Sequence, residues 1–277
     1  MNSFIIQLSL RQQTLERYIT SFRRMNANYH LFSLYSESDL IDNLPEDFTA
    51  NNYIALASIK GLKLSRQLKE TNFNSVEEFK NYKSTYETAF FYKDGERFDQ
   101  KYYKHLGLPL LNSNSKIVDL NEYLDTKFDK DVFIKPTSDL KGFVGGILKA
   151  GTTMGEFIDK TSRMPHWELE PTLIADVKKI HSEYRFFVVG DEVITGSRYM
   201  YKTQVIPSTE IPNSIWSAAH VYARKYQPDR VFTMDLALLE NGDIEIVEYN
   251  CFNGSGVYHA PLDELVKRLM EIDIARS

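Results

Sequence analysis

The apolar positions of this chain switch between strand-like and helix-like spacing along its whole length. At the start, residues 3–8 and 29–35 have the short apolar runs of strands, whereas residues 12–26 have the three-to-four-residue spacing of an amphipathic helix. A strand, a helix and a second strand in this order predict an α/β unit.

The opening region continues to a polar stretch at residues 93–96, where we place a domain boundary. Ser75 and Glu78 have the three-residue spacing of a capping box, which favours a helix beginning there. The expected helices of this part are residues 62–70 and 76–82, and its further strands are residues 53–58 and 88–92. We therefore expect residues 1–95 to form an N-terminal α/β domain.

Strands and helices are mixed in the remainder of the chain. The expected helices are residues 99–106, 152–160, 211–226 and 261–272. The expected strands are residues 131–135, 144–149, 172–177, 183–189 and 192–198, followed by a hairpin at residues 235–250. The pattern predicts an α+β chain built in several lobes.

The hairpin carries candidate metal ligands. Its turn, Asn241-Gly242-Asp243, separates two apolar runs, which is a strong signal for a tight connection. Glu248 and Asn250 on the returning strand are two residues apart and point to one face, and Asp235 on the first strand can lie opposite them. Two carboxylates and an amide oxygen make an oxygen-only site suited to Mg²⁺. The alternative is a solvated polar face on an ordinary hairpin.

Composition narrows the kinds of partner that we expect. The 277 residues are 43% hydrophobic and 26% charged, with a formal net charge of -5, which argues against a general nucleic-acid-binding surface. The one cysteine, Cys251, excludes internal disulfides and fits a reducing cytosol. No apolar run approaches the roughly 20 residues that span a bilayer, and the first residues lack the features of a signal peptide. We expect a cytoplasmic protein without nucleic-acid or membrane partners.

Two further segments carry positive charge at defined places. In the first, Lys135 ends an apolar strand before Pro136, and the glycines and Lys141 that follow can fold over a phosphate chain. In the second, Arg185 and Arg198 lie on successive predicted strands, where two guanidinium groups facing one cleft can bind carboxylate or phosphate. Taken separately, the segments also fit an ordinary turn and a pair of surface arginines.

In this order, the three segments resemble the ATP-grasp superfamily and are similar to its carboxylate–amine ligases. The resemblance spans residues 96–258, and the Lys-Pro-x-x-Asp-x-Lys-x-Phe-x-Gly motif at residues 135–145 looks most like a small phage and bacterial clade. It implies an ATP-grasp fold in which a nucleotide is held between two α+β lobes. The implied lobes are residues 96–178, with the central lid, and residues 179–277, with the metal site; residues 1–95 would be the preceding domain.

The resemblance also implies how ATP would be held. Lys135 would contact the α- and β-phosphates, and Lys141 would lie nearest the transferred group. A basic residue of the first lobe is usual as well, and Lys101 is the candidate, with Arg97 as the alternative. Glu183 would bind the ribose. The implied hinge beside adenine is Asp176, Val177, Lys178 and Lys179.

For catalysis and substrate binding the resemblance implies a second set of residues. Thr233 stands where several of these ligases carry an arginine, so Arg185 or Arg198 would stabilise the transferring phosphoryl group. The implied Mg²⁺ ligands are Asp235, Glu248 and Asn250. The implied substrate-binding turn is Asn253, Gly254, Ser255 and Gly256, with His259 shortly after it.

The implied reaction is an ATP- and Mg²⁺-dependent ligation. A carboxylate would attack the γ-phosphate of ATP, and an amine would then displace phosphate from the acyl phosphate. The expected cofactors are ATP and Mg²⁺, with Mn²⁺ as a substitute, and the expected partners are small-molecule or peptide carboxylates and amines. The alternatives are kinase-like phosphoryl transfer to a small molecule and a non-catalytic ATP-binding interaction module. The sequence determines neither the substrates nor the oligomeric state.

Overall fold

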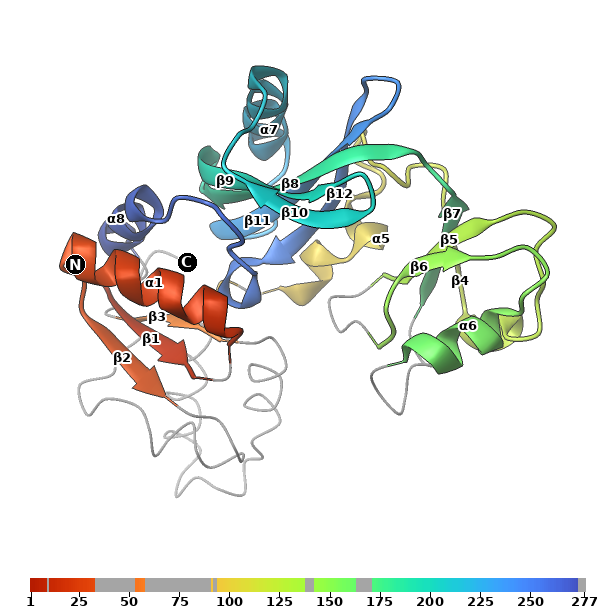
Figure 1. The fold of residues 1–277 in the computed structure, drawn as a ribbon, viewed down its shortest axis with the longest axis horizontal. Coiled ribbons are helices and arrows are strands. Elements are labelled where there is room, and N and C mark those ends of the chain that lie inside the picture. Colours follow the sequence, from red (N-terminus) through yellow and green to blue (C-terminus); the bar gives the residue numbers. More distant parts are fainter. Residues whose placement is uncertain are drawn as a thin grey trace.

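A computed structural model describes residues 1–8, 10–32, 53–57, 91, 94–137, 142–162 and 171–273 of the chain. Within these residues the strands form three sheets, of three, four and five strands (Figure 1). The expected helices at residues 62–70 and 76–82 lie outside the described residues, as does the expected strand at residues 88–92 apart from Phe91.

The three-stranded sheet is parallel and contains the beginning of the chain. Its strands are β1 (Ser3–Gln7), β2 (Tyr29–Phe32) and β3 (Tyr53–Leu56), in the order β2-β1-β3. Helix α1 (Gln12–Met25) connects β1 to β2, and it ends at Asn26, whose φ of 52° is left-handed. The strand–helix–strand opening expected from the sequence is therefore confirmed.

The four-stranded sheet is antiparallel and forms a separate lobe on the right of Figure 1. Its strands are β4 (Lys116–Val118), β5 (Val132–Pro136), β6 (Gly146–Leu148) and β7 (Thr172–Asp176), in the order β4-β7-β5-β6. Helix α6 (Met154–Thr161) begins at a capping box formed by Thr153 and Glu156. Its buried Met154 and Ile158 pack against Ile134 of β5.

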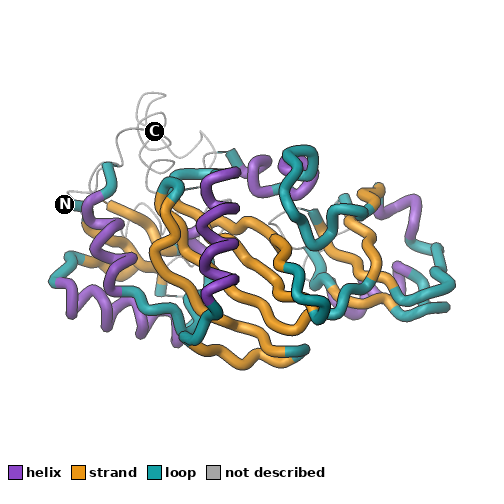
Figure 2. The backbone as a smooth tube through the Cα atoms, turned by 90° about the horizontal axis from the view of Figure 1, so that it is seen from above, coloured by secondary structure: helices purple, strands orange, loops and turns teal. Residues whose placement is uncertain are grey.

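The five-stranded antiparallel sheet lies between the other two. Its strands are β8 (Ile180–Val189), β9 (Glu192–Tyr201), β10 (Gln204–Ser208), β11 (Val231–Leu239) and β12 (Ile244–Cys251), in the order β10-β9-β8-β11-β12. Helix α7 (Asn213–Lys225) crosses one face of this sheet (Figure 2). Helix α8 (Asp263–Glu271) packs beside α1. The edge strand β10 was not expected from the sequence.

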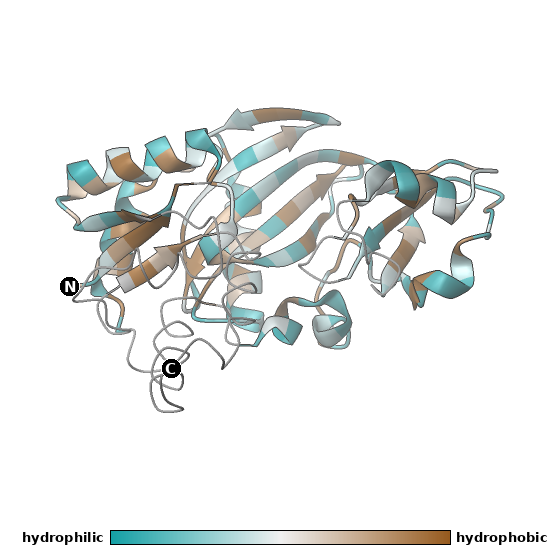
Figure 3. Ribbon diagram, turned by 90° about the horizontal axis from the view of Figure 1, so that it is seen from below, coloured by the Kyte–Doolittle hydropathy of each residue, from teal (hydrophilic) through white to brown (hydrophobic). Residues whose placement is uncertain are grey.

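Both faces of the five-stranded sheet are buried, as adjacent residues of β8 demonstrate. Phe186 packs in the cluster that contains Ile215 of α7, whereas Phe187 packs in the cluster that contains Leu265 of α8. Apolar residues accordingly follow the strands in Figure 3, while polar residues mark the outer faces of the helices. Consecutive side chains point to opposite faces of a strand, so β8 is one apolar run because each face is covered.

The described residues form an α+β fold, as expected, but one helix is much shorter than its pattern predicted. The helix expected at residues 99–106 is α5 (Gln100–Tyr103), a single turn. Gln100 and Tyr103 are buried, whereas Tyr102 and Leu106 are about half exposed, so no continuous apolar face extends the helix. None of the described helices is long and apolar enough to cross a bilayer.

Candidate active site

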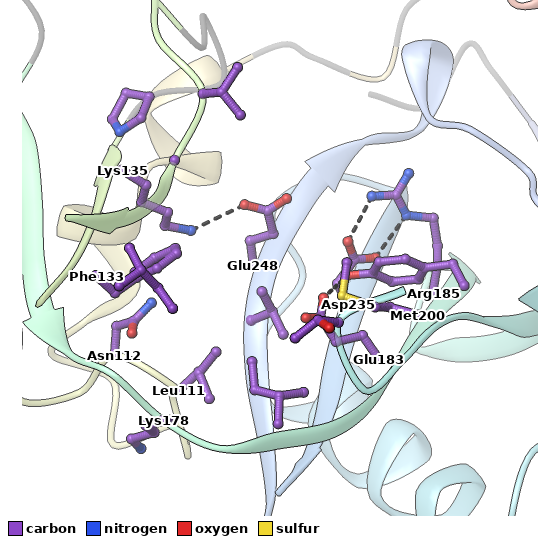
Figure 4. A pocket seen from close by; sticks show the side chains of 18 of the residues that line it. Leu111, Asn112, Phe133, Lys135, Lys178, Glu183, Arg185, Met200, Asp235 and Glu248 are labelled. Carbon is purple, nitrogen blue, oxygen red and sulfur yellow. Dashed lines mark hydrogen bonds and ion pairs between the residues drawn. The ribbon is translucent and has the colours of Figure 1, made fainter. Parts of the chain in front are cut away.

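A cavity of about 730 Å³ lies between the four-stranded and five-stranded sheets, and both sheets line it (Figure 4). Its volume is in the range typical of small-molecule sites. Phe133 and Lys135 reach it from β5, and Glu183, Asp235 and Glu248 reach it from the five-stranded sheet. The cavity therefore collects residues from both lobes expected from the sequence.

Lys135 and Glu248 connect the two lobes across the cavity. The Nζ atom of Lys135 lies 3.1 Å from Oε2 of Glu248, and both side chains are largely buried. In Figure 4 the lysine extends from the β5 side toward the glutamate on β12. Pro136 follows Lys135 and ends β5, which fixes the backbone from which the amine projects. The fold thus brings together the two residues assigned to phosphate and metal.

Arg185 and Asp235 form a buried ion pair deeper in the cavity. They are direct partners in the β8–β11 register, and the guanidinium donates from Nε to Oδ1 at 2.8 Å and from Nη2 to Oδ2 at 2.7 Å. Burial acts to lower the pKa of Arg185, but the charge and hydrogen bonds of Asp235 outweigh burial and raise it above the ordinary value. Arg185 is therefore a permanent positive charge in a site with little water.

Two tyrosine rings hold Arg185 from the side. The rings of Tyr199 and Tyr258 are stacked with centroids 4.9 Å apart, and Cζ of Arg185 lies 5.8 Å and 5.4 Å from their centroids. Tyr258 has a φ of 43°, a left-handed conformation that is uncommon outside glycine. Nη1 of Arg185 also donates to the Gly256 carbonyl at 3.4 Å. The guanidinium is thus held by charge, by rings and by backbone.

Glu183 is a buried carboxylate on the same strand as Arg185. Burial raises its pKa, with the nearby charges of Asp235 and Glu248 acting in the same direction and the hydrogen bond from Tyr199 acting against them. The Tyr199 hydroxyl donates that bond, and its own pKa is raised, chiefly by burial. Tyr199 therefore stays protonated as a donor to Glu183.

The predicted metal ligands share one face of the β11–β12 hairpin. Asp235 is paired with Glu248, and Asn250 is two residues further along β12. Asn250 does not line the cavity, and its buried Nδ2 has no hydrogen-bond partner among the described residues. Rotation of this amide would present its oxygen instead, so the donor set fits a hard cation. A bound cation would compete with Arg185 for Asp235 and with Lys135 for Glu248.

The described residues contain no group of three or more His, Cys, Asp or Glu side chains placed to hold a metal ion. The predicted set has two carboxylates and one amide, so any further ligands of the metal would have to come from phosphate and water.

The predicted hinge lies at one end of the cavity. Asp176 ends β7, and Val177 and Lys178 line the cavity with it. Nζ of Lys178 is paired with Glu245 at 2.6 Å. Lys179 is not among the lining residues, and its carbonyl accepts the backbone N–H of Glu240 at 3.0 Å. Three of the four predicted hinge residues are therefore at the cavity.

Arg198 is not placed with Arg185, contrary to the expectation that both face one cleft. It is paired in register with Tyr184, the neighbour of Arg185 on β8, and so belongs to the opposite face of the sheet. Its Nε contacts the Ile206 carbonyl at 3.4 Å, and its guanidinium lies over Tyr201. Spacing alone could not reveal this, because register shifts between β8 and β9 decide which residue faces the cavity.

Neither basic residue proposed for the first lobe lines the cavity. Nζ of Lys101 lies 3.9 Å from Asp99 and is half exposed, and Arg97 donates to the Gln227 carbonyl at 2.5 Å. Lys141 lies outside the described residues.

The predicted substrate turn also does not line the cavity. Asn253 bonds to the backbone of Phe91 and Ala55, and the Ser255 hydroxyl donates to the Cys251 carbonyl at 2.7 Å. Gly254 is exposed, and Gly256 contributes only its carbonyl to Arg185. The turn supports the site from behind, because its polar groups are used inside the fold.

Several cavity residues were not found from the sequence. Arg11, just before α1, lines the cavity from the N-terminal domain, and Tyr199, Lys202 and Tyr258 line it from β9 and beyond. Lys202 has a φ of 45° in the tight β9–β10 turn. A positively charged residue at such a turn is a common surface feature, so only the three-dimensional arrangement identifies it.

Comparison with known proteins places this arrangement in a class, that of the ATP-grasp domains. Residues 113–267 match a family model described as an ATP-grasp domain, the second family of its clade. The match covers more than half of the chain, which belongs to this family. The family resemblance stated from the sequence is thereby confirmed. A sequence search among curated proteins finds no match.

Solved structures share the fold at low sequence identity. D-alanine–D-alanine ligase from Bacillus anthracis aligns with a TM-score of 0.58 and 12% identity, covering 97% of this chain and 92% of that chain. ATP-grasp ligase PsnB complexed with precursor peptide PsnA2 and AMPPNP aligns with a TM-score of 0.54 and 14% identity over 99% of both chains. L-amino acid ligase from Bacillus licheniformis aligns with a TM-score of 0.51 and 11% identity, covering 93% of this chain and 69% of that chain.

Proposed function

We propose that this protein is an ATP- and Mg²⁺-dependent ligase that joins a carboxylate to an amine and releases ADP and phosphate. The observation that carries the proposal is the convergence of Lys135 from one lobe with Glu248, Asp235 and Arg185 from the other in one cavity. The names of the similar structures support it, since they include an amino acid ligase and a D-alanine–D-alanine ligase. In another of these structures, PsnB is bound to a precursor peptide and AMPPNP.

In this proposal the nucleotide lies between the lobes. The backbone of Asp176, Val177 and Lys178 would face the base, and Glu183 would bind the ribose. Lys135, and Lys141 by the family resemblance, would bind phosphate oxygens. Asp235, Glu248 and Asn250 would hold Mg²⁺, which when bound supplies positive charge to the phosphates. Permanent charges placed before the reaction lower the barrier to phosphoryl transfer.

The two steps need positioning and charge more than side-chain chemistry. An oxygen of the substrate carboxylate attacks the γ-phosphorus, and the bond from that phosphorus to the β–γ bridging oxygen breaks, releasing ADP. The amine nitrogen then attacks the acyl carbon, phosphate leaves with its carbon–oxygen bond electrons, and the amine proton passes to solvent. Arg185 would stabilise the transferring phosphoryl group, and Arg11 is placed to bind the acidic substrate.

The test is release of ADP and phosphate from Mg²⁺-ATP with pooled amino acids, polyamines and small carboxylic acids. The proposal predicts release only when both an acid and an amine are present. Glu248→Gln should abolish it, whereas Glu240→Gln, an exposed residue of the same hairpin, should not. Release with an acid alone would favour kinase-like transfer. Binding of ATP without release would favour a macromolecular acceptor or an interaction module.

A further inference from the structure

A second hollow lies between α1 and the segment that leads into α8, two helices that are neighbours in Figure 1. Its volume is about 540 Å³. Arg17 and Arg24 line it from α1, His259 and Asp263 line it from the C-terminal segment, and Thr209 lines it from the connection after β10. None of these residues lines the larger cavity.

The acidic groups of this hollow already have partners. The Asp263 carboxylate accepts a hydrogen bond from the Ser21 hydroxyl at 2.7 Å and one from Nη1 of Arg24 at 2.9 Å. Glu16 accepts from the side-chain amide of Gln12 at 2.8 Å. These contacts compensate Arg24 and Asp263, but among the described residues they leave Arg17 without an acidic partner.

Arg17 is the uncompensated cation of the hollow. Its Nη2 donates to the Ala260 carbonyl at 2.6 Å, and its buried Nε has no hydrogen-bond partner within the described ranges. Across the described part of the chain, no carboxylate forms an ion pair with it. Burial, and secondarily the charge of Arg24, lowers the pKa of Arg17. A half-buried guanidinium that has only a neutral acceptor favours an anion beside it.

We propose that this hollow is a binding site for a carboxylate-bearing ligand, with Arg17 as the group that binds the carboxylate. The guanidinium fork matches the two oxygens of a carboxylate. The ionised residues of the wall are two arginines and two carboxylates, so their charges cancel. A singly charged group therefore fits the hollow better than a phosphate dianion, which Glu16 and Asp263 would repel.

The same short segment contributes to both cavities. Tyr258 lines the larger cavity and His259 the second, and they are adjacent in the chain. Arg185 binds the Gly256 carbonyl at one end of this segment, and Arg17 binds the Ala260 carbonyl at the other. A carboxylate that engages Arg17 would compete with the Ala260 carbonyl. The carboxylate site is separate from the proposed ligase activity and does not depend on it.

Calorimetric titration with succinate tests the site directly, with inorganic phosphate as the comparison anion. Wild type should bind succinate, and Arg17→Gln should weaken that binding at least tenfold. Arg23→Gln is the matched control, because it removes the same charge from an exposed position of α1 outside the hollow, and it should bind as wild type does. If Arg17→Gln fails to fold, Arg17→Lys serves instead, since it keeps the charge and loses the fork.

A second titration separates this site from the nucleotide cavity. Succinate binding should be unchanged in Lys135→Ala and in the presence of saturating Mg²⁺-ADP. Three results would overturn the proposal: no succinate binding to wild type, equal binding to wild type and the Arg17 variant, or tighter binding of phosphate than of succinate. Loss of succinate binding in Lys135→Ala would assign the anion to the larger cavity and would also overturn it.

Discussion

At the scale of single residues, Glu183 has its carboxylate where the fold disfavours a negative charge. It is buried beside Asp235 and Glu248, and its pKa is raised mainly by that burial. The folded protein therefore binds the proton of Glu183 more tightly than the unfolded chain does. By linkage, its contribution to stability is fully present below the ordinary glutamate pKa of about 4.3 and falls as the pH rises toward the raised value.

Replacement of this carboxylate should trade stability against nucleotide binding. We expect Glu183→Gln to raise the free energy of unfolding at pH 7 by about 1 kcal/mol, because an isosteric amide removes the buried charge. Its effect should be small at pH 4, and it should weaken binding of ATP if Glu183 contacts the ribose. Urea unfolding at both pH values and calorimetry with Mg²⁺-ATP measure the two effects. A less stable variant at pH 7 would contradict the electrostatic part.

Residue identity in the site was partly predictable from spacing. Asp235, Glu248 and Asn250 were found because strand alternation and one tight turn determine their common face. Arg198 was misplaced because a register shift on β9 decides which neighbour faces the cavity, and Tyr199 has that position instead. Arg11 was missed because its place depends on docking of the N-terminal domain, which no local pattern contains.

At the scale of elements, the β5–β6 hairpin places Lys135. Gly145 is essential to this packing, because a Cβ atom added there would lie 2.6 Å from Cβ of Lys135 and 3.1 Å from the Ile134 carbonyl oxygen. A Cβ added at Gly146 would meet only the far end of the Phe157 ring, at 3.2 Å. The two adjacent glycines therefore form a matched pair for mutation.

We expect Gly145→Ala to destabilise the lobe by about 1–3 kcal/mol, because the strands must separate to admit the methyl group. Displacement of Lys135 should also weaken Mg²⁺-ATP binding several-fold. Gly146→Ala should cost less than about 1 kcal/mol, since an aromatic ring can shift. Thermal unfolding and nucleotide titration of both variants measure this difference. Equal effects of the two substitutions would show that the close contact does not position Lys135.

Element boundaries were predicted best where burial and capping agree. Thr153 and Glu156 begin α6 close to its predicted start, because both members of the capping box are present. The helix predicted at residues 99–106 is a single turn, since burial alternates without a continuous face. The edge strand β10 has exposed Val205 and Ile206, so its sequence has no core-facing pattern to detect.

At the scale of the whole molecule, Asn253 fastens the N-terminal domain to the C-terminal sheet. Its side chain donates to the Ala55 carbonyl and accepts from the Phe91 N–H at 2.9 Å, and its own carbonyl accepts from Ala57 at 3.0 Å. The sequence placed Asn253 at a substrate turn. The contacts instead give it a structural role, which explains why an amide is needed at a fully buried position.

Asn253→Ala should lower the free energy of unfolding by about 1–3 kcal/mol, because buried backbone groups lose their partners. Amide hydrogens of β3 should exchange faster in this variant. Asn253→Asp keeps the acceptor and loses the donor, so a smaller acceleration is expected there, and Asn241→Ala in the exposed turn is the control for a neutral substitution. Unchanged exchange at β3 in Asn253→Ala would argue against this fastening role.

The central claim is that the cavity between the two lobes holds a magnesium nucleotide, and calorimetric titration of AMPPNP with Mg²⁺ tests it most directly. Wild type should bind, and Lys135→Ala should bind at least tenfold more weakly, because it removes the amine that faces Glu248. Lys149→Ala, an exposed lysine of the same lobe paired with Asp131, should bind as wild type does. Failure of wild type to bind, or equal affinity in Lys135→Ala, would contradict the account.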